Sequence, residues 1–222
     1  MMTLERTPIK EPSSTRLTLT LAVAGLVSGL LLVGVYELTL PRIKANESDA
    51  TQRAVLAVVP GSRTVERLNL RDGQLAAAPA SSDSPLFAAY DETGALAGYA
   101  LLGSGAGFQD KIVLMFGYDP RAQTVTGLEI IDSRETPGLG DKIFKDPKFD
   151  AEFDGLAVRP EPKLVKEGQS SRPNEVDAIT GATISSRAVV SIVNATIRQW
   201  LPLLSGAAHG VEGESGASLH GG

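Results

Sequence analysis

The sequence predicts an α+β fold, in which a single membrane-spanning helix near the N-terminus precedes a domain with a largely antiparallel sheet and packed helices. Three observations predict it. An apolar run without charges, Leu17–Tyr36, has the composition of a membrane helix. Short aliphatic segments bounded by Gly and Pro lie between residues 96 and 131, as is typical of strands. Apolar residues then recur at helical spacing after Thr183, so the strands cluster before one long helix.

The run Leu17–Tyr36 matches the length of about 20 residues, or roughly 30 Å of helix, that crosses a hydrocarbon core. The alternative is a cleaved signal peptide. Its apolar region is usually shorter, about 7–15 residues, and an Ala-x-Ala site follows it. This sequence has no such site there, and Glu37–Ile43 resembles a continuing structural element. We therefore expect a single anchor over residues 17–36.

Basic residues flank the anchor unequally. Arg6, Lys10 and Arg16 precede it, and Arg42 and Lys44 follow it. Because cytoplasmic flanks carry more Lys and Arg, this small difference favours a cytoplasmic N-terminus over residues 1–16.

The segment after the anchor mixes helical and strand patterns. Glu47–Val59 has a mixed helical pattern that ends at Pro60-Gly61, and residues 70–85 form a low-complexity stretch that we expect on the surface. The segments with strand composition are Leu96–Leu102, Lys111–Tyr118 and Thr124–Ile131. Asp119-Pro120 marks a tight turn, which predicts a hairpin between the last two strands.

Three further segments receive structural interpretations. Gly103–Phe108 has glycines at alternate positions, but Phe108 replaces the third glycine of the dinucleotide-binding fingerprint and a strand follows. We expect a flexible turn there. Asp141–Lys148 carries charges of both signs and predicts a solvated face, while Asp146–Phe153 predicts a short helix.

The C-terminal part of the domain predicts one amphipathic helix. Its apolar positions are Val189, Ile192, Val193, Ile197, Trp200 and Leu201. Thr183 lies at or just before the start of this helix, and we expect Pro202 to close it. From Ser205 onward the sequence is rich in Gly, Ser and Ala, which predicts a disordered tail over 205–222.

Composition excludes several kinds of protein. The chain has no cysteine, which excludes disulfides, thiolate nucleophiles and cysteine-ligated iron–sulfur clusters. Both histidines, His209 and His220, lie in the tail, so we expect no haem or histidine zinc site in the folded part. The net charge of -5 and the lack of a basic stripe argue against nucleic acid. Any redox chemistry would therefore need an organic cofactor.

The most informative segment is the hydroxyl-rich run Asp177–Ser186, which lies directly before the helical pattern. The start of a helix offers unpaired backbone N–H groups and a positive dipole end, and both favour a phosphate. Gly181 leaves the backbone open to a bulky ligand. The alternative is that a Ser or Thr only caps the helix. A cap needs one hydroxyl, however, and does not need Gly-Ala between two threonines.

Two motifs resemble those of a known family. Asp177-Ala-Ile-Thr-Gly-Ala-Thr183 resembles the flavinylation motif Asp-(Gly/Ala)-x-(Ser/Thr)-Gly-Ala-Thr, and Glu135-Thr-Pro-Gly-Leu-Gly140 resembles a loop found upstream in the same proteins. From the membrane segment to about Leu204, the chain is similar to RnfG (RsxG), the G subunit of the Rnf (Rsx) ion-translocating electron transport complexes.

The resemblance implies FMN attached through a phosphoester to Thr183, which would serve as an anchor with no catalytic role. Asp177 would belong to the signature that the attaching enzyme reads. The residues that the resemblance places at the cofactor are Thr183, Thr180, Gly181, Ala182 and Asp177, together with Glu135, Thr136, Gly138 and Leu139. We expect Glu135–Leu139 to line the flavin ring, although Thr-Pro-Gly is also an ordinary turn sequence.

The resemblance also implies a location, partners and a role. Residues 37–204 would form a periplasmic domain on the inner membrane. The partners would be the other Rnf membrane subunits, especially the D subunit, which is the second one with covalent FMN, and a flavin transferase that uses FAD and Mg²⁺. The chain would relay electrons in a complex that exchanges them between ferredoxin and NAD⁺ while moving Na⁺ or H⁺.

Two alternatives to the G subunit of Rnf remain. One is NqrC, the C subunit of the Na⁺-translocating NADH:quinone reductase, which shares the attachment motif, although the compact length of this chain favours the Rnf protein. The other is a membrane-anchored periplasmic binding or assembly domain without redox activity, in which Thr180 and Thr183 merely cap a helix.

Overall fold

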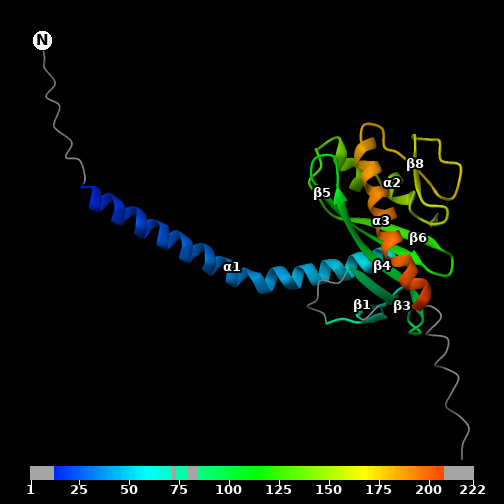
Figure 1. Ribbon diagram of the computed structural model, residues 1–222, viewed down its shortest axis with the longest axis horizontal. Helices are drawn as coiled ribbons and strands as arrows, with labels where there is room; N and C mark the ends of the chain where they lie inside the picture. Colours follow the sequence, from blue (N-terminus) through cyan, green and yellow to red (C-terminus); the bar gives the residue numbers. More distant parts are fainter. Residues whose placement is uncertain (1–12, 72–73, 80–84, 208–222) are drawn as a thin grey trace, which may run out of the picture. The chain divides into compact units, whose positions relative to one another are not determined.

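The computed structural model describes residues 13–71, 74–79 and 85–207 of the chain, and its contacts divide it into two units, Met1–Asp49 and Ala50–Gly222 (Figure 1). Helix α1, Ser14–Val58, belongs to both units, since its last turns form part of the second. The residues beyond these ranges include most of the predicted N-terminal segment and residues 208–222 of the predicted tail.

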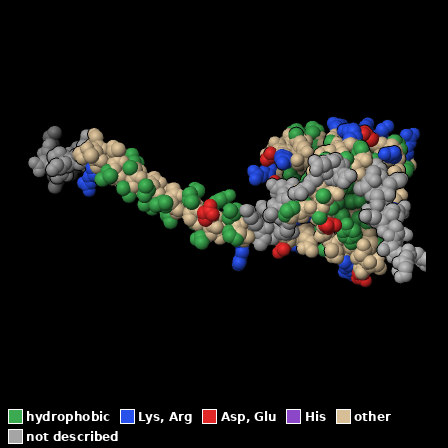
Figure 2. Space-filling view, turned by 60° about the horizontal axis from the view of Figure 1, so that its bottom comes forward, with side chains coloured by type: hydrophobic (Ala, Val, Ile, Leu, Met, Phe, Trp, Pro, Cys, Tyr) green, Lys and Arg blue, Asp and Glu red, His purple; other side chains and the backbone are tan. Residues whose placement is uncertain are grey.

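The first unit is the N-terminal part of α1. Its segment Ser14–Ile43 is long and apolar enough to cross a membrane, and none of that apolar stretch is buried in the protein. Figure 2 shows hydrophobic side chains spaced along this helix, with charged side chains only towards its ends. The hydroxyls of Thr18, Thr20 and Thr39 donate to carbonyls four residues earlier, which satisfies them without water. The helix thus spans the predicted Leu17–Tyr36 and continues through Glu37–Ile43, as expected.

The second unit is built on a seven-stranded sheet with the strand order β2-β1-β3-β4-β5-β6-β7, in which every neighbouring pair is antiparallel. The strands are β1 Thr64–Arg71, β2 Gln74–Ala77, β3 Leu86–Tyr90, β4 Leu96–Ala106, β5 Lys111–Asp119, β6 Thr124–Ser133 and β7 Leu156–Ala157. A separate parallel pair joins β8, Lys163–Val165, to β9, Glu175–Asp177. This arrangement confirms the predicted α+β class, the three predicted strands and the hairpin between β5 and β6.

Both faces of the sheet are covered. Helix α3, Thr183–Ala207, packs on one face. The end of α1, through Val55 and Val58, packs on the other face together with Val59, the residue after the helix. Neighbouring residues of β3 therefore alternate between two hydrophobic cores, so that all of Leu86–Ala89 is buried. Because both faces of β3 are buried, its sequence does not alternate between apolar and polar residues. For this reason it was not identified as a strand from the sequence.

The predicted turn at Gly103–Phe108 was wrong over most of its length. Gly103 and Gly105 belong to β4 and pair with Leu114 and Ile112 of β5. Their missing side chains let α3 approach, since a Cβ on Gly103 would lie 2.8 Å from the Ile192 side chain and one on Gly105 only 2.7 Å from it. Close packing of a helix on the sheet explains these glycines, as it can for glycine inside a strand.

Three further predicted segments can be compared with the structure. The predicted short helix is α2, Pro147–Ala151, which Asp146 caps by accepting from the Lys148 N–H. Within the predicted surface stretch 70–85, the described residues form the end of β1 and all of β2, and Leu70 is exposed; residues 72–73 and 80–84 lie outside the described residues. The predicted solvated face starts as a 3₁₀ helix, η1 Gly140–Phe144, whose Asp141 and Ile143 are buried.

Helix α3 continues beyond Pro202 to Ala207, so Pro202 does not close it. Proline lacks an N–H and is costly inside a helix. Here the buried Leu204 holds the last turn against the core, which offsets part of that cost.

Candidate functional site

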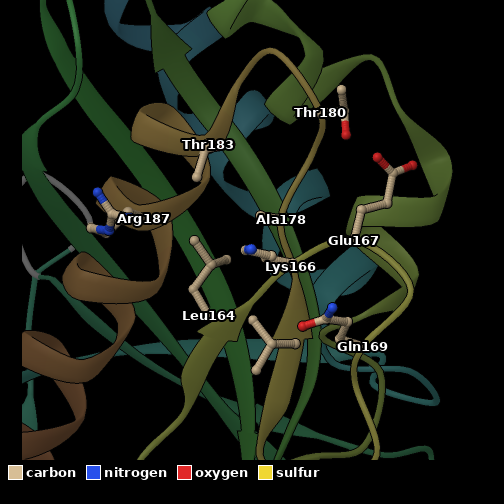
Figure 3. A pocket seen from close by; sticks show the side chains of 9 residues that line it. Leu164, Lys166, Glu167, Gln169, Ala178, Thr180, Thr183 and Arg187 are labelled. Carbon is tan, nitrogen blue, oxygen red and sulfur yellow. The ribbon is translucent and has the colours of Figure 1, made fainter.

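A cavity of about 500 Å³ opens where the start of α3 meets the parallel pair β8–β9 (Figure 3). The residues that line it are Leu164, Val165, Lys166, Glu167, Gln169, Ala178, Thr180, Thr183 and Arg187. Its volume lies within the range of about 300–1,000 Å³ that is usual for small-molecule sites. The cavity thus lies at the hydroxyl-rich run that the sequence singled out.

The turn before α3 is held by a hydroxyl other than those of the two threonines. Ser186 accepts from the Ile179 N–H at 3.2 Å and donates to the Ala182 carbonyl at 3.0 Å. Within the described part of the chain, the hydroxyls of Thr180 and Thr183 make no hydrogen bond, and both residues are exposed. The hydrogen bonds that helix capping by these threonines would require are therefore not present in the structure.

Gly181 has a backbone conformation that favours glycine. Its φ of 84° lies in the left-handed region, where a side chain would be strained. The turn therefore requires a glycine here, and Thr183 becomes the first residue of α3.

Basic side chains surround the Thr180–Thr183 turn. Lys166 and Arg187 line the cavity and form no ion pair with any other described residue. Arg187 lies four residues after Thr183, which places both on the same face of α3. Lys142, from η1, donates to the Thr180 carbonyl at 3.1 Å. Unpaired Arg and Lys at a helix N-terminus are typical of a site for a phosphoryl group.

The predicted loop Glu135–Gly140 lies against the same helix start. Glu135 is only 5% exposed, and its carboxylate accepts from the Ser185 hydroxyl at 2.6 Å and from the Gln109 N–H at 3.1 Å. Gly107 and Gly140 flank the carboxylate so closely that a Cβ on either would overlap it. The hydrogen bond that Ser185 donates to Glu135 therefore joins the first motif to the hydroxyl-rich run that contains the second.

The pKa of the Glu135 carboxyl reflects two opposed effects. Burial raises it, but the hydrogen bonds from Ser185 and from the backbone N–H groups of Gln109, Asp110 and Phe108 outweigh burial, and the pKa lies below its ordinary value. Glu135 is thus an ionised group held inside the domain. Its partner Ser185 is 2% exposed and was not singled out from the sequence, although it belongs to the hydroxyl-rich run.

Exposed apolar side chains occur beside this buried carboxylate. Leu139 is 51% exposed, Ile184 52% and Phe108 60%. Each is the sequence neighbour of a residue that closely approaches the Glu135 carboxylate, namely Gly140, Ser185 and Gly107. An exposed apolar surface therefore adjoins the start of α3.

The remaining predicted site residues lie close to these. Thr136 donates from its hydroxyl to the Gln109 side-chain carbonyl at 2.6 Å, and Gly138 has a φ of 78°. Ala182 is buried beneath the turn. Asp177 does not line the cavity; its carboxylate accepts from backbone N–H groups of the loop after β8. Sequence reasoning missed Lys166, because only the fold brings β8 to α3. It also missed Arg187, although the four-residue spacing from Thr183 in the expected helix was a signal that could have found it.

Two family models match the chain. The model described as an FMN-binding domain matches residues 107–198, and the model described as the RnfG N-terminal region matches residues 2–58. The first range contains both motifs and all the residues that line the cavity. The second contains all of the apolar segment of α1.

Curated relatives match over most of their length. The G subunit of the ion-translocating oxidoreductase complex of Methanosarcina acetivorans is 28% identical over 82% of this chain and 92% of that protein. The G subunit of the Na(+)-translocating ferredoxin:NAD(+) oxidoreductase complex of Acetobacterium woodii is 29% identical over 89% of this chain and 97% of that protein.

The fold also resembles a solved structure. The C subunit of the Na(+)-translocating NADH-quinone reductase of Parabacteroides distasonis superposes with a TM-score of 0.58 at 23% identity, covering 72% of this chain and 93% of that one. At this identity the likeness concerns the fold.

Proposed function

Since the chain belongs to the RnfG family, the G subunits of the Rnf ion-translocating oxidoreductase complexes, we propose that it is the electron-relay subunit of such a complex and carries FMN through a phosphoester on Thr183. The observation that carries this proposal is the pair of free threonine hydroxyls at a cavity with two unpaired cations. The match to the N-terminal region of the RnfG family favours this assignment over the C subunit of the NADH:quinone reductase.

The residues present fit FMN. A phosphoryl group on Thr183 would lie at the positive end of α3, where Lys166 and Arg187 neutralise its charge. Lys142 already binds the Thr180 carbonyl and so adds positive charge near the turn. Leu139 and Ile184 offer exposed apolar surface for a flat aromatic ring, and Gly138 adds bare backbone beside it.

We assign Glu135 a supporting role. Its carboxylate is occupied by Ser185 and Gln109, so it keeps the 135–140 loop against α3 and thereby orients Leu139. Thr136 adds a second tie between that loop and Gln109. When bound, FMN supplies the ability to accept and donate electrons through its ring.

Attachment is a transfer of FMN from FAD that the flavin transferase catalyses with Mg²⁺. The Thr183 Oγ forms a bond to the FMN phosphorus, the anhydride bond of FAD breaks, AMP leaves, and the hydroxyl proton is released. The product contains FMN less one water, so the peptide mass rises by that amount. Lys166 and Arg187, which line the cavity, would stabilise the negative charge on the phosphoryl oxygens.

The test is tryptic mass spectrometry of the peptide around Thr183 after co-expression with a flavin transferase. We expect the added mass in the wild type and in Thr180→Ala, and its absence in Thr183→Ala. Thr180→Ala is the matched control because it removes a neighbouring hydroxyl that lines the same cavity. An unmodified wild-type peptide would refute the proposal and would leave a membrane-anchored binding or assembly domain.

We also propose that the chain lies in the inner membrane with the second unit in the periplasm and the other Rnf subunits, including the D subunit, as partners. The lack of cysteines allows a direct test. Arg121→Cys, in the exposed turn between β5 and β6, should react with a membrane-impermeant maleimide in spheroplasts, and Thr15→Cys should not. The reverse pattern of labelling would overturn the orientation.

A further inference from the structure

The loop 166–174 connects two parallel strands, β8 and β9, and so must return along their full length. Parallel strands usually need a connection of a dozen or more residues, often a helix. The shorter loop here has no regular secondary structure of its own and depends on bonds from β9. Glu175 and Asp177 lie two positions apart on that strand, so their carboxylates project on the same side.

Both carboxylates bind the backbone of the loop. Asp177 accepts from the N–H groups of Gly168 at 2.8 Å, Gln169 at 3.1 Å and Ser170 at 2.8 Å. Glu175 accepts from the N–H group of Ser171 at 3.0 Å. Four consecutive N–H groups are thus bound by two side chains of one strand.

Asp177 controls the part of the loop that faces Thr183. The residues Lys166, Glu167 and Gln169 line the cavity, and Gly168, between them, has a φ of 73° that favours glycine. Figure 3 shows Lys166 reaching into the cavity from the side of this loop, with Thr183 and Arg187 on α3. Asp177 itself does not line the cavity.

We propose that Asp177 is a positioning residue for flavin attachment: it fixes the loop 166–170, and through it the ammonium group of Lys166, opposite the Thr183 hydroxyl. This inference rests on the proposed function. According to this inference, Asp177, the first residue of the motif, acts by positioning other groups of this protein, and the transferase does not have to contact it. Without the carboxylate, three backbone amides of the loop that begins at Lys166 lose their acceptor.

The expected loss of attachment rate can be estimated from the effect of misplacing a group near a reacting centre. Displacing a charged group by about 1 Å from a reacting centre can slow a reaction on the order of 100-fold. We therefore expect Asp177→Ala to lower the kcat of attachment by roughly 10- to 100-fold, with little change in the transferase's KM for the acceptor protein. If the transferase read Asp177 directly, the KM would rise instead.

The experiment is a double-mutant cycle on the full-length protein in detergent, with purified flavin transferase, FAD and Mg²⁺. The variants are Asp177→Ala, Lys166→Ala and the double variant. If Asp177 acts through Lys166, the double variant should be no slower than Asp177→Ala by more than about twofold. Independent, multiplicative losses, or a loss in KM, would overturn the inference. Absence of FMN from the wild type would instead refute the proposed function.

Hydrogen exchange provides a readout that does not depend on the transferase. In Asp177→Ala without flavin, the amides of Gly168, Gln169 and Ser170 should lose protection, while the rest of the domain keeps it. Glu175→Ala is the matched control, because it frees Ser171 and leaves those three amides bound. We expect this control to accept FMN at close to the wild-type rate. Unchanged exchange in Asp177→Ala would also overturn the inference.

Discussion

Replacing Ser185 with alanine should destabilise the second unit by removing its hydrogen bond to Glu135. The Ser185 hydroxyl donates to the Glu135 carboxylate at 2.6 Å, and both side chains are buried. A hydrogen bond to a buried charged group contributes about 1.5–3 kcal/mol. We therefore expect the free energy of unfolding to fall by about 2 kcal/mol at pH 7, which corresponds to a melting temperature lower by roughly 4–8 °C.

The effect should depend on pH, with a definite sign. The folded-state pKa of Glu135 lies below its ordinary value of 4.5, because its hydrogen bonds outweigh burial. A carboxyl of this kind adds stability that is complete above the unfolded pKa and is lost as the pH falls through the folded pKa. Ser185→Ala raises the folded pKa and so removes part of this stability. The difference between wild type and variant should be largest above pH 4.5 and should narrow below it.

The assay is denaturant unfolding of the full-length protein, followed by tryptophan fluorescence. The sequence contains one tryptophan, and Trp200 is buried on α3, so the signal reports on that helix. Ser191→Ala is the control, because Ser191 is exposed on the same helix. We expect it to change stability by less than about 0.5 kcal/mol. The reasoning would be refuted if Ser185→Ala behaved like this control, or if its effect grew as the pH fell from 7 to 4.

Three further changes test other parts of the structure. Gly117→Ala should destabilise the domain by about 1–3 kcal/mol in the same unfolding assay, because a Cβ there would overlap the Val58 carbonyl at the end of α1. Arg187→Glu should slow FMN attachment at Thr183 more than Arg187→Ala does, and added salt should reduce the gap between their rates. Burial, followed by repulsion from neighbouring carboxylates, raises the pKa of Asp150 to about 6, so Asp150→Asn should stabilise the domain on the order of 1 kcal/mol at pH 7 and much less at pH 4, as measured by unfolding at both pH values.

Local patterns predicted the parts of the fold that local chemistry controls. The strand β5 and the turn at Asp119-Pro120 follow from aliphatic runs and turn residues, and the start of α3 follows from its apolar spacing. Gly181 was singled out from the sequence as an opening for a bulky ligand, and the structure adds a second reason for glycine there, its positive φ.

What the sequence could not predict depends on distant contacts. Gly103 and Gly105 have the spacing of a glycine loop, but they lie in strand β4. There the absence of side chains leaves room for α3 to pack on the sheet. Nothing in the sequence around Glu135 indicated that its carboxylate would be buried and bound by Ser185, fifty positions later in the sequence. Likewise, no local pattern links Lys166 to Thr183.

The covering of the sheet by the end of α1 has a practical consequence for protein production. The anchor helix and the domain share one continuous helix, and Val55, Val58 and Val59 are core residues. A soluble fragment that starts at Pro60 would expose Phe87, Ala89 and Met115 on an uncovered face of the sheet. Such an exposed apolar surface promotes aggregation. A fragment that starts just before Ala50 keeps that face covered and leaves out Ser14–Ile43. The apolar segment can therefore be removed without uncovering the sheet only if the truncation point lies within α1, before the residues that pack on the sheet.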